Sequence, residues 1–408
     1  MKKITLAKFG ILVATILLLF LAPSSIGRPN QAETEAVVVA MGVDKESDIY
    51  EVSIQIIQPA EGLSYTDNLV ISSQKGKSIA LAIDALALNL GKEIGFAHCK
   101  VLILSEEVCK DNIINVIDYF LRTGLLGSTM SVVNTDKKAK DTLQASSEGI
   151  NKQINSVQYI MEYNKLNVHA AETHIKSLLI DYLNPHSTSL MSTLSILDEG
   201  KDEEASGSGG GTEGGGGSGG QSAEQKPKEL VNKGQTSVFK SGKKIGSLNE
   251  EQVRGYKWML PQTVNGSASI EDVTSKHYDN AKITAALIDR QFSDSCKIIN
   301  NIPTLTYNLR VFLRINEIIQ EGKDVLLDSN TTYFDDALKQ KFKTKIEAQV
   351  ADAVDFAKTN KADIMNFYDI FNKADTRAWK KFLSTLSEGD SYLNHVNVIT
   401  NVEVLGRI

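Results

Sequence analysis

The sequence predicts an α+β protein in which three mixed α/β domains follow an N-terminal export segment. Three observations support this fold class. Segments with the alternating pattern of half-buried strands and segments with helical spacing of apolar residues follow one another along the chain. A basic and then apolar start precedes them, and the roughly 380 residues after it indicate two or three domains. A Gly-rich stretch interrupts the middle of the chain.

The N-terminal segment, residues 1–27, has the three parts of a secretory signal. Lys2, Lys3 and Lys8 precede an apolar run at residues 9–22, and small residues follow the run. The run is shorter than the roughly 20 residues that span a bilayer as a helix, which favours a cleaved signal peptide. The absence of an Ala-x-Ala site favours a retained signal anchor instead, and both outcomes stay open. A retained segment places the rest of the chain outside the cytoplasm, by the positive-inside rule.

Charge and cysteine content argue against two classes of protein. The net charge of -6 gives no basic surface, so nucleic acid is not an expected partner. The three cysteines are too few for a disulfide framework. One bridge between Cys99 and Cys109 is an option, and packing as free thiols is the other, because spacing alone does not give the geometry.

The first predicted domain covers residues 28–140. Its expected elements are, in chain order, strands at 35–44 and 50–58, a helix from Ser78 to Gly91, a strand at 100–104, a helix at 105–122 and a strand at 129–133. The first two strands form a hairpin across a polar turn. Ser78 is a good helix cap and Gly91 a good helix end. The last three elements form a β-α-β unit.

The middle domain covers residues 141–300. Its expected elements are a helical stretch at 141–183 with interruptions at Gly149 and near Asn164, strands at 189–197 and 236–240, and a helix that begins after Ser247 or Asn249. Residues 201–228 are rich in Gly, Ser and acidic side chains and have almost nothing apolar to bury, which is typical of a flexible coil. Because short strands flank this stretch, we expect a loop inside one domain.

The third domain covers residues 301–408. Its expected elements are a half-buried strand at 307–317, a long helix at 332–358, a helix at 376–387 and a closing strand at 396–405. In the long helix, apolar side chains recur every four residues, which predicts one core-facing stripe. They are Leu338, Phe342, Ile346, Val350 and Val354.

Motifs for chemistry are missing from the sequence. Outside the Gly-rich stretch it has no G-x-S-x-G nucleophile, and it has no H-E-x-x-H zinc motif and no phosphate loop. The histidines are scattered, at His98, His169, His174, His186, His277 and His395, and each is interpreted as a structural or surface residue. Trp258 and Trp379 are expected in the core. We therefore predict no catalytic, cofactor-binding or metal-ligating residues.

Several segments together resemble the Ger(x)C family, the C subunits of bacterial nutrient germinant receptors. They are Val-Ala-Met-Gly-Val-Asp-Lys at 39–45, Gly-Phe-Ala-His-Cys-Lys-Val-Leu-Ile-Leu-Ser-Glu-Glu at 95–107, Ile-Asp-Tyr-Phe-Leu-Arg at 117–122, Val-Phe-Lys-Ser-Gly-Lys-Lys-Ile-Gly-Ser-Leu-Asn-Glu-Glu at 238–251, Arg254-Gly255, Trp258, Asp-Ile-Met-Asn-Phe at 363–367 and Trp379. They follow one another over nearly the whole exported part of the chain.

The resemblance implies a three-domain α+β protein on the outer face of the spore inner membrane. It implies two membrane-embedded partner subunits, one A-type and one transporter-like B-type, and neither enzymatic activity nor a cofactor. Members of the family usually carry a lipidated Cys at the start of the mature chain. No Cys follows the apolar run here, so anchoring by the N-terminal segment or by the partners is expected instead.

Two other classes of protein remain as alternatives. An exported multidomain protein with clefts between its domains is typical of a stand-alone solute-binding protein. A cell-wall enzyme is the weaker alternative, because location alone favours it.

Overall fold

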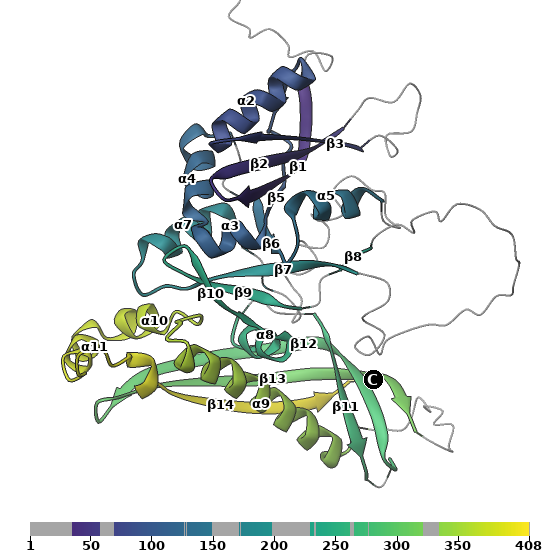
Figure 1. The fold of residues 1–408 in the computed structure, drawn as a ribbon. Coiled ribbons are helices and arrows are strands. Elements are labelled where there is room, and N and C mark those ends of the chain that lie inside the picture. Colours follow the sequence, from purple (N-terminus) through teal and green to yellow (C-terminus); the bar gives the residue numbers. More distant parts are fainter. Residues whose placement is uncertain are drawn as a thin grey trace, which may run out of the picture.

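The computed structural model describes residues 35–57, 69–125, 127, 129–148, 171, 173–197, 229–231, 234–261, 265–275, 277–320 and 334–407. In these ranges the chain forms two β-sheets with helices packed against them (Figure 1). The first sheet ends at Leu248 and the second begins at Ser267. The predicted α+β class is confirmed.

The first sheet is mixed, with strand order β10-β9-β7-β6-β5-β1-β2-β3, and the short strands β4 and β8 pair with β1 and β7. Its strands are β1 (Glu35–Glu46), β2 (Ile49–Ile57), β3 (Leu69–Gly76), β4 (Glu93–Gly95), β5 (Val101–Leu104), β6 (Ser131–Thr135), β7 (Ser189–Leu197), β8 (Glu229–Val231), β9 (Thr236–Lys240) and β10 (Lys243–Leu248). The central strands β1, β5, β6 and β7 are parallel. β1 and β2 form the predicted hairpin, and β7 and β9, on either side of the Gly-rich stretch, pair in antiparallel fashion as neighbours.

Helices cover both faces of this sheet. They are α2 (Ile79–Leu90), α3 (Glu106–Asp111), α4 (Ile114–Thr123), α5 (Ala139–Glu148) and α7 (Ile175–Leu183). α2, α3, α4 and α7 pack on one face in a common core that includes Leu102 and Leu104 of β5. α5 packs on the opposite face, where Leu143 contacts a second core that includes Val101 and Ile103. The alternation of side chains along a strand thus supplies both cores.

The helix predicted from Ser78 to Gly91 is confirmed as α2. The Ser78 hydroxyl accepts a hydrogen bond from the backbone N–H of Leu81 at 3.3 Å. Gly91 ends the helix with a φ of 61°, a left-handed conformation that glycine adopts without steric cost.

The single helix predicted at 105–122 is wrong, because the structure has two helices, α3 and α4, with a break at Asn112 and Ile113. Asn112 is extended, and its side-chain oxygen accepts a hydrogen bond from Ile114 N at 3.0 Å. Ile113 N donates to Gly242 O at 2.9 Å, in the turn between β9 and β10. A contact from far along the chain therefore interrupts the helix while the apolar spacing continues.

The second sheet has the strand order β11-β12-β13-β14. Its strands are β11 (Ser267–Val273), β12 (Ala281–Ile299), β13 (Ile302–Ile319) and β14 (Asn397–Gly406). β12 and β13 form a long hairpin that turns at Asn300 and Asn301, whose φ values of 50° and 65° fit a type I′ turn. The predicted strand at 307–317 is confirmed within β13, and the one at 396–405 is confirmed as β14, which begins one residue later; the two strands are parallel.

The remaining helices are α8 (Glu250–Trp258), α9 (Asp336–Thr359), α10 (Phe367–Ala374), α11 (Thr376–Leu383) and the 3₁₀ helix η1 (Tyr392–His395). α9 lies along the second sheet (Figure 1), and all five side chains of its predicted stripe are buried. α8 begins after Asn249, whose side chain and that of Gln252 form a capping box. α11 ends at Leu383, short of the predicted end at 387.

Other expectations lie outside the described residues or stay predictions. The export segment at 1–27, the Gly-rich stretch at 201–228 and residues 149–170 of the predicted helical stretch fall outside, whereas the end of that stretch is helical as α7. The three-domain division stays a prediction, and its boundary at 140/141 falls within α5 while that at 300/301 falls in the β12–β13 turn. No helix in the part of the chain that the structure describes is both long and apolar enough to cross a bilayer.

Candidate functional site

The histidines and tryptophans considered in the sequence analysis do not lie together in the structure. His98, His277 and His395 are exposed, His174 and His186 are half-buried, and His169 lies outside the described residues. Trp258 and Trp379 are buried, as predicted. No cluster of His, Cys, Asp or Glu within the described ranges has the geometry to hold a metal ion.

The cysteines are free thiols, so the optional bridge between Cys99 and Cys109 is not formed. Both side chains are buried, and burial raises the pKa of the Cys99 thiol to about 12. A thiol with so high a pKa is not a nucleophile at neutral pH. Three features remain as candidate sites: a groove beside α9, a crevice at the strand ends of the first sheet, and the joint between the two sheets.

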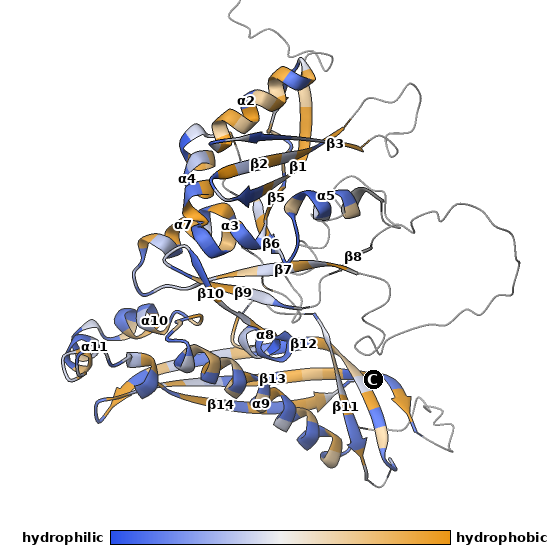
Figure 2. Cartoon of the chain, viewed as in Figure 1, coloured by the Kyte–Doolittle hydropathy of each residue, from blue (hydrophilic) through white to orange (hydrophobic). Residues whose placement is uncertain are grey.

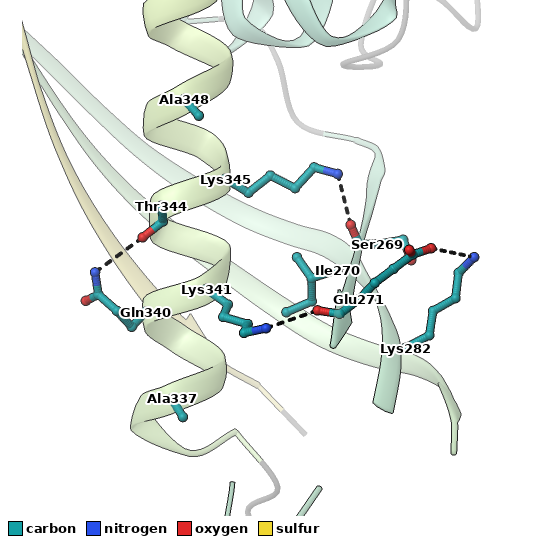
Figure 3. Close-up of a pocket in the computed structure, with 10 residues that line it drawn as sticks. All are labelled: Ser269, Ile270, Glu271, Lys282, Ala337, Gln340, Lys341, Thr344, Lys345 and Ala348. Carbon is teal, nitrogen blue, oxygen red and sulfur yellow. Dashed lines mark hydrogen bonds and ion pairs between the residues drawn. The ribbon is translucent and has the colours of Figure 1, made fainter. Parts of the chain in front are cut away.

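The groove beside α9 lies between this helix and the edge strand β11, and has a volume of about 710 Å³ (Figure 3). Lys345 Nζ donates to Ser269 O at 3.0 Å, and Lys341 Nζ donates to Glu271 O at 3.1 Å. Lys282 forms an ion pair with the Glu271 carboxylate at 3.1 Å. An edge strand exposes unpaired carbonyl groups, and the lysines of α9 satisfy them here. These lysine contacts therefore hold α9 on the sheet, and they leave few charged groups of the groove free to bind a ligand.

The strand-end crevice lies where the parallel strands β1, β5 and β6 end, and has a volume of about 470 Å³. α3 leaves β5 toward one face of the sheet and α5 leaves β6 toward the other. Such a topological switch point is where open α/β sheets bind ligands. Its lining residues are Asp44, Lys45, Glu46, Ile49, Glu51, Lys75, Ser105, Glu106, Glu107, Lys110, Asp136, Lys137, Lys138 and Asp141.

One buried carboxylate of the crevice has a structural task. Asp44 is 6% exposed, and its oxygens accept hydrogen bonds from Ala139 N at 2.8 Å and Lys140 N at 3.0 Å, which caps α5. Burial raises the pKa of the Asp44 carboxyl, although these hydrogen bonds act in the opposite direction. A Cβ atom at Gly42 would lie 2.9 Å from Ala139 Cβ. Gly42 and Asp44 together therefore dock α5 on β1.

Most other charges around the crevice are paired. Lys45 bonds to Asp111, and Lys110 Nζ lies 3.0 Å from Glu107 Oε1. The buried hydroxyl of Ser105, at the end of β5, has no hydrogen-bond partner among the described residues. The crevice can therefore hold a small polar molecule, and its mixed lining favours neither charge sign.

The joint between the two sheets is formed by the turn after α7 and the start of α10. The imidazole ring of His186 stacks on the ring of Tyr368, with centroids 3.6 Å apart and planes 9° apart. Asn184 Nδ2 donates to Asp369 Oδ2 at 3.2 Å, and Ser187 Oγ donates to Asn366 Oδ1 at 3.2 Å. We call these six residues the joint.

A buried carboxylate holds the α10 side of the joint in place. Asp363 is 2% exposed and accepts hydrogen bonds from Phe367 N and Tyr368 N, both at 2.8 Å, and from the Tyr392 hydroxyl at 2.7 Å. Burial raises the pKa of the Asp363 carboxyl. The fully buried Trp379 contacts the Tyr368 ring edge-on at 5.7 Å. Tyr368 is thereby fixed as the platform on which His186 stacks.

We expect acid to weaken the joint through His186. Burial holds the pKa of His186 below its ordinary value of 6.5, although Asp363 and Asp369 raise it and Lys240 lowers it further. Because the folded pKa is lowered, the neutral ring contributes stability that is present above pH 6.5 and lost as the pH falls through the folded pKa. Chemical denaturation across this range measures the effect. His186→Phe keeps an aromatic stack and should remove this part of the pH dependence, and an unchanged slope would contradict the assignment.

Apart from the joint, a set of contacts between α8 and α9 also connects the two sheets. Trp258 Nε1 donates to Gln349 Oε1 at 2.7 Å, and Gln349 Nε2 donates to Glu251 Oε2 at 2.6 Å. A Cβ atom at Gly255 would lie 1.8 Å from Gln349 O, so only glycine allows the two helices to approach this closely. α8, which follows the last strand of the first sheet, is thus packed closely against α9 of the second sheet.

Comparisons with known proteins agree with this architecture. The family model described as "Spore germination protein N-terminal domain" matches residues 30–196, and the one described as "Spore germination B3/GerAC like, C-terminal" matches residues 234–405. A search of curated proteins gave no match. Among solved structures, the chain is similar to the one titled "Crystal Structure of the GerBC protein", with a TM-score of 0.53 and 14% sequence identity over 90% of this chain and 97% of that chain. At this identity the likeness concerns the fold.

Proposed function

Because the chain belongs to the spore germination GerAC family, we propose that it is the non-enzymatic, extracytoplasmic C subunit of a spore germinant receptor, required for nutrient-triggered germination. The observation that carries the proposal is the match of both family models, in order, over residues 30–196 and 234–405. The similarity of the fold to that of GerBC supports it.

The proposal includes partners and a location. The subunit acts with two membrane-embedded subunits, one A-type and one transporter-like B-type. It lies at the outer face of the spore inner membrane, held there by the N-terminal segment or by its partners. The basic and apolar start of the sequence supports the export, and the lack of a Cys after the apolar run argues against a lipid anchor there.

The roles of the motif residues support a non-enzymatic function. Asp44 caps α5, Asp363 caps the start of α10, and Trp258 donates to a side chain of α9. Gly255 allows two helices to approach, and Trp379 packs in the core. These side chains hold helices against their sheets and against one another, and they do not converge on one cavity.

Co-purification tests the partner assignment. The full chain with an affinity tag, isolated from detergent-solubilised spore membranes, should bring a multi-span protein and a transporter-like protein with it. An untagged strain is the control for non-specific recovery. Recovery of the tagged chain alone, from membranes that contain both other proteins, would count against a receptor complex.

A stand-alone solute-binding protein is the second candidate function, and the strand-end crevice is the observation that favours it. A molecule that binds only the folded chain at 100 times its Kd stabilises it by about 2.7 kcal/mol. A thermal-shift screen of amino acids and sugars should then show a rise in Tm that is lost in Ser105→Val. A flat screen would remove this candidate.

A further inference from the structure

Helix α2 exposes apolar side chains where most surface helices expose polar ones. Apart from Asp84 and Asn89, all of its residues are apolar. One side of the helix, with Ile79, Ala82, Ile83 and Leu86, is buried on the first sheet. Figure 2 shows the helix as hydrophobic over most of its length. A helix that is apolar all round is ordinarily covered on all sides.

The opposite side of α2 is uncovered. Leu81 and Leu88 are two turns apart on one line of the helix, facing away from the sheet, and their side chains are 54% and 84% exposed. The half-buried Ala85 and the exposed Asp84 lie between them. Leucines this exposed, in register along a helix, form a narrow apolar stripe, which we call the α2 stripe (Leu81, Ala85 and Leu88).

The N-terminal segment of the chain enters the fold beside this helix. α2 ends at Leu90, β4 begins at Glu93, and Glu93 pairs with Glu35, the first residue of β1. Figure 1 shows the start of β1 and α2 at the same end of the molecule, with the second sheet at the other end. The residues between the apolar run at 9–22 and Glu35 span at most about 45 Å even when fully extended. The apolar run is therefore joined by 12 residues to the end of the molecule that carries the α2 stripe.

We propose that the α2 stripe rests on the surface of the lipid bilayer and orients the chain there, with the second sheet pointing away from the membrane. The inference rests on the proposed function, which places the chain at the outer face of a membrane. The entry point of the chain favours lipid at the stripe, because a segment apolar enough to enter a bilayer joins the fold at the end of the molecule that carries the stripe.

The α2 stripe is large enough to orient a chain that is already held at the membrane, but it is too small to hold the chain there. Burial of one leucine side chain strengthens an association by roughly 10- to 100-fold, so two leucines alone do not hold a protein on a membrane. Stable membrane binding needs a second signal, which the N-terminal segment supplies when it is retained. Once a tether of this length holds the chain, the local concentration of lipid is high, and a weak apolar contact is sufficient.

Tryptophan fluorescence of the full chain tests the proposal. The chain is reconstituted in vesicles of equal parts phosphatidylglycerol and phosphatidylethanolamine, with and without brominated acyl chains, which quench tryptophan on contact. Leu88→Trp places a probe in the stripe. Ile299→Trp is the matched control, because Ile299 is an apolar residue at the end of β12, in the second sheet, and is 54% exposed. Trp258 and Trp379 are buried and common to both variants.

We expect brominated lipid to quench the added emission of Leu88→Trp at least twofold more than that of Ile299→Trp. Equal quenching of both probes, or no quenching of Leu88→Trp in chains that float with the vesicles, would overturn the proposal. Chains that do not float at all would also overturn it, because the tether would then be missing. Failure of the proposed function has a different signature, which is normal germination of spores without the gene, whatever the quenching result.

Discussion

Alanine in place of Gly255 is expected to destabilise the chain by about 3 kcal/mol, because overpacking against a backbone that cannot move is costly. The added Cβ would lie 1.8 Å from Gln349 O, so α8 and α9 must separate. The sign of the change is informative, since alanine in an unobstructed helix position is favoured over glycine by about 1 kcal/mol. Chemical denaturation measures the difference.

The matched control is Gly127→Ala, at an exposed position where an added Cβ meets nothing within 4 Å. We expect this variant to stay within about 0.5 kcal/mol of the wild type. A stabilised Gly255→Ala chain would mean that α8 does not pack on α9 as closely as the structure has it.

Removal of the Asp363 carboxylate is expected to cost about 3 kcal/mol, because a buried group that loses its partner leaves several donors unsatisfied. In Asp363→Ala, the N–H groups of Phe367 and Tyr368 and the hydroxyl of Tyr392 all lose their acceptor. The start of α10 should loosen, and with it the platform for His186. Hydrogen exchange at the two amide groups, together with denaturation, measures both effects.

Tyr392→Phe provides the graded control, since it removes one of the three donors and keeps the carboxylate bonds to the backbone. We expect a loss of about 1 kcal/mol from this variant. If the two variants lost equal stability, the carboxylate bonds to the α10 backbone would contribute nothing, and the joint would not depend on Asp363.

Elements whose signal is local were predictable from the sequence. The apolar stripe of α9, the cap of α2 and its glycine end, and the first hairpin depend on residues close together in the chain, and all are confirmed. The break between α3 and α4 was not predictable, because its cause is a hydrogen bond from Ile113 N to Gly242 O. Nothing in the spacing of apolar residues near Ile113 records that contact.

The strand β12 is absent from the elements predicted from the sequence, and the reason is different. Register shifts between Thr284 and Ala285 and between Leu287 and Asp289 interrupt its pairing with β13. The second shift leaves Ile288 unpaired on β12 and moves the following side chains to the other face, so the alternation that begins at Ala281 is lost after Leu287. The outer half of β12 is also largely exposed on both faces, which weakens the pattern further.

The sequence singled out several residues of the candidate sites through the family resemblance, but it did not predict what those residues do. Asp44 and Asp363 lie in the segments that carry the family resemblance, and Gly255 does as well. Asp44 caps a helix whose first residue is 95 positions away, and Gly255 meets a backbone atom of Gln349. Such roles depend on tertiary contacts, so a single sequence marks the residue and the fold supplies the reason. The exposed α2 stripe is similar, because apolar residues in a helix predict burial until the neighbours are known.

The rate of nutrient-triggered germination in a strain that lacks the gene for this chain is the most direct test of the central claim. Dormant spores of the deletion strain should form normally but fail to germinate with the nutrient that acts through this receptor. The full chain supplied in trans should restore germination, as should the Gly127→Ala control, whereas Gly255→Ala should restore it poorly. Germination of the deletion strain at the wild-type rate with every nutrient that triggers the parent strain would contradict the claim that the chain is a required receptor subunit.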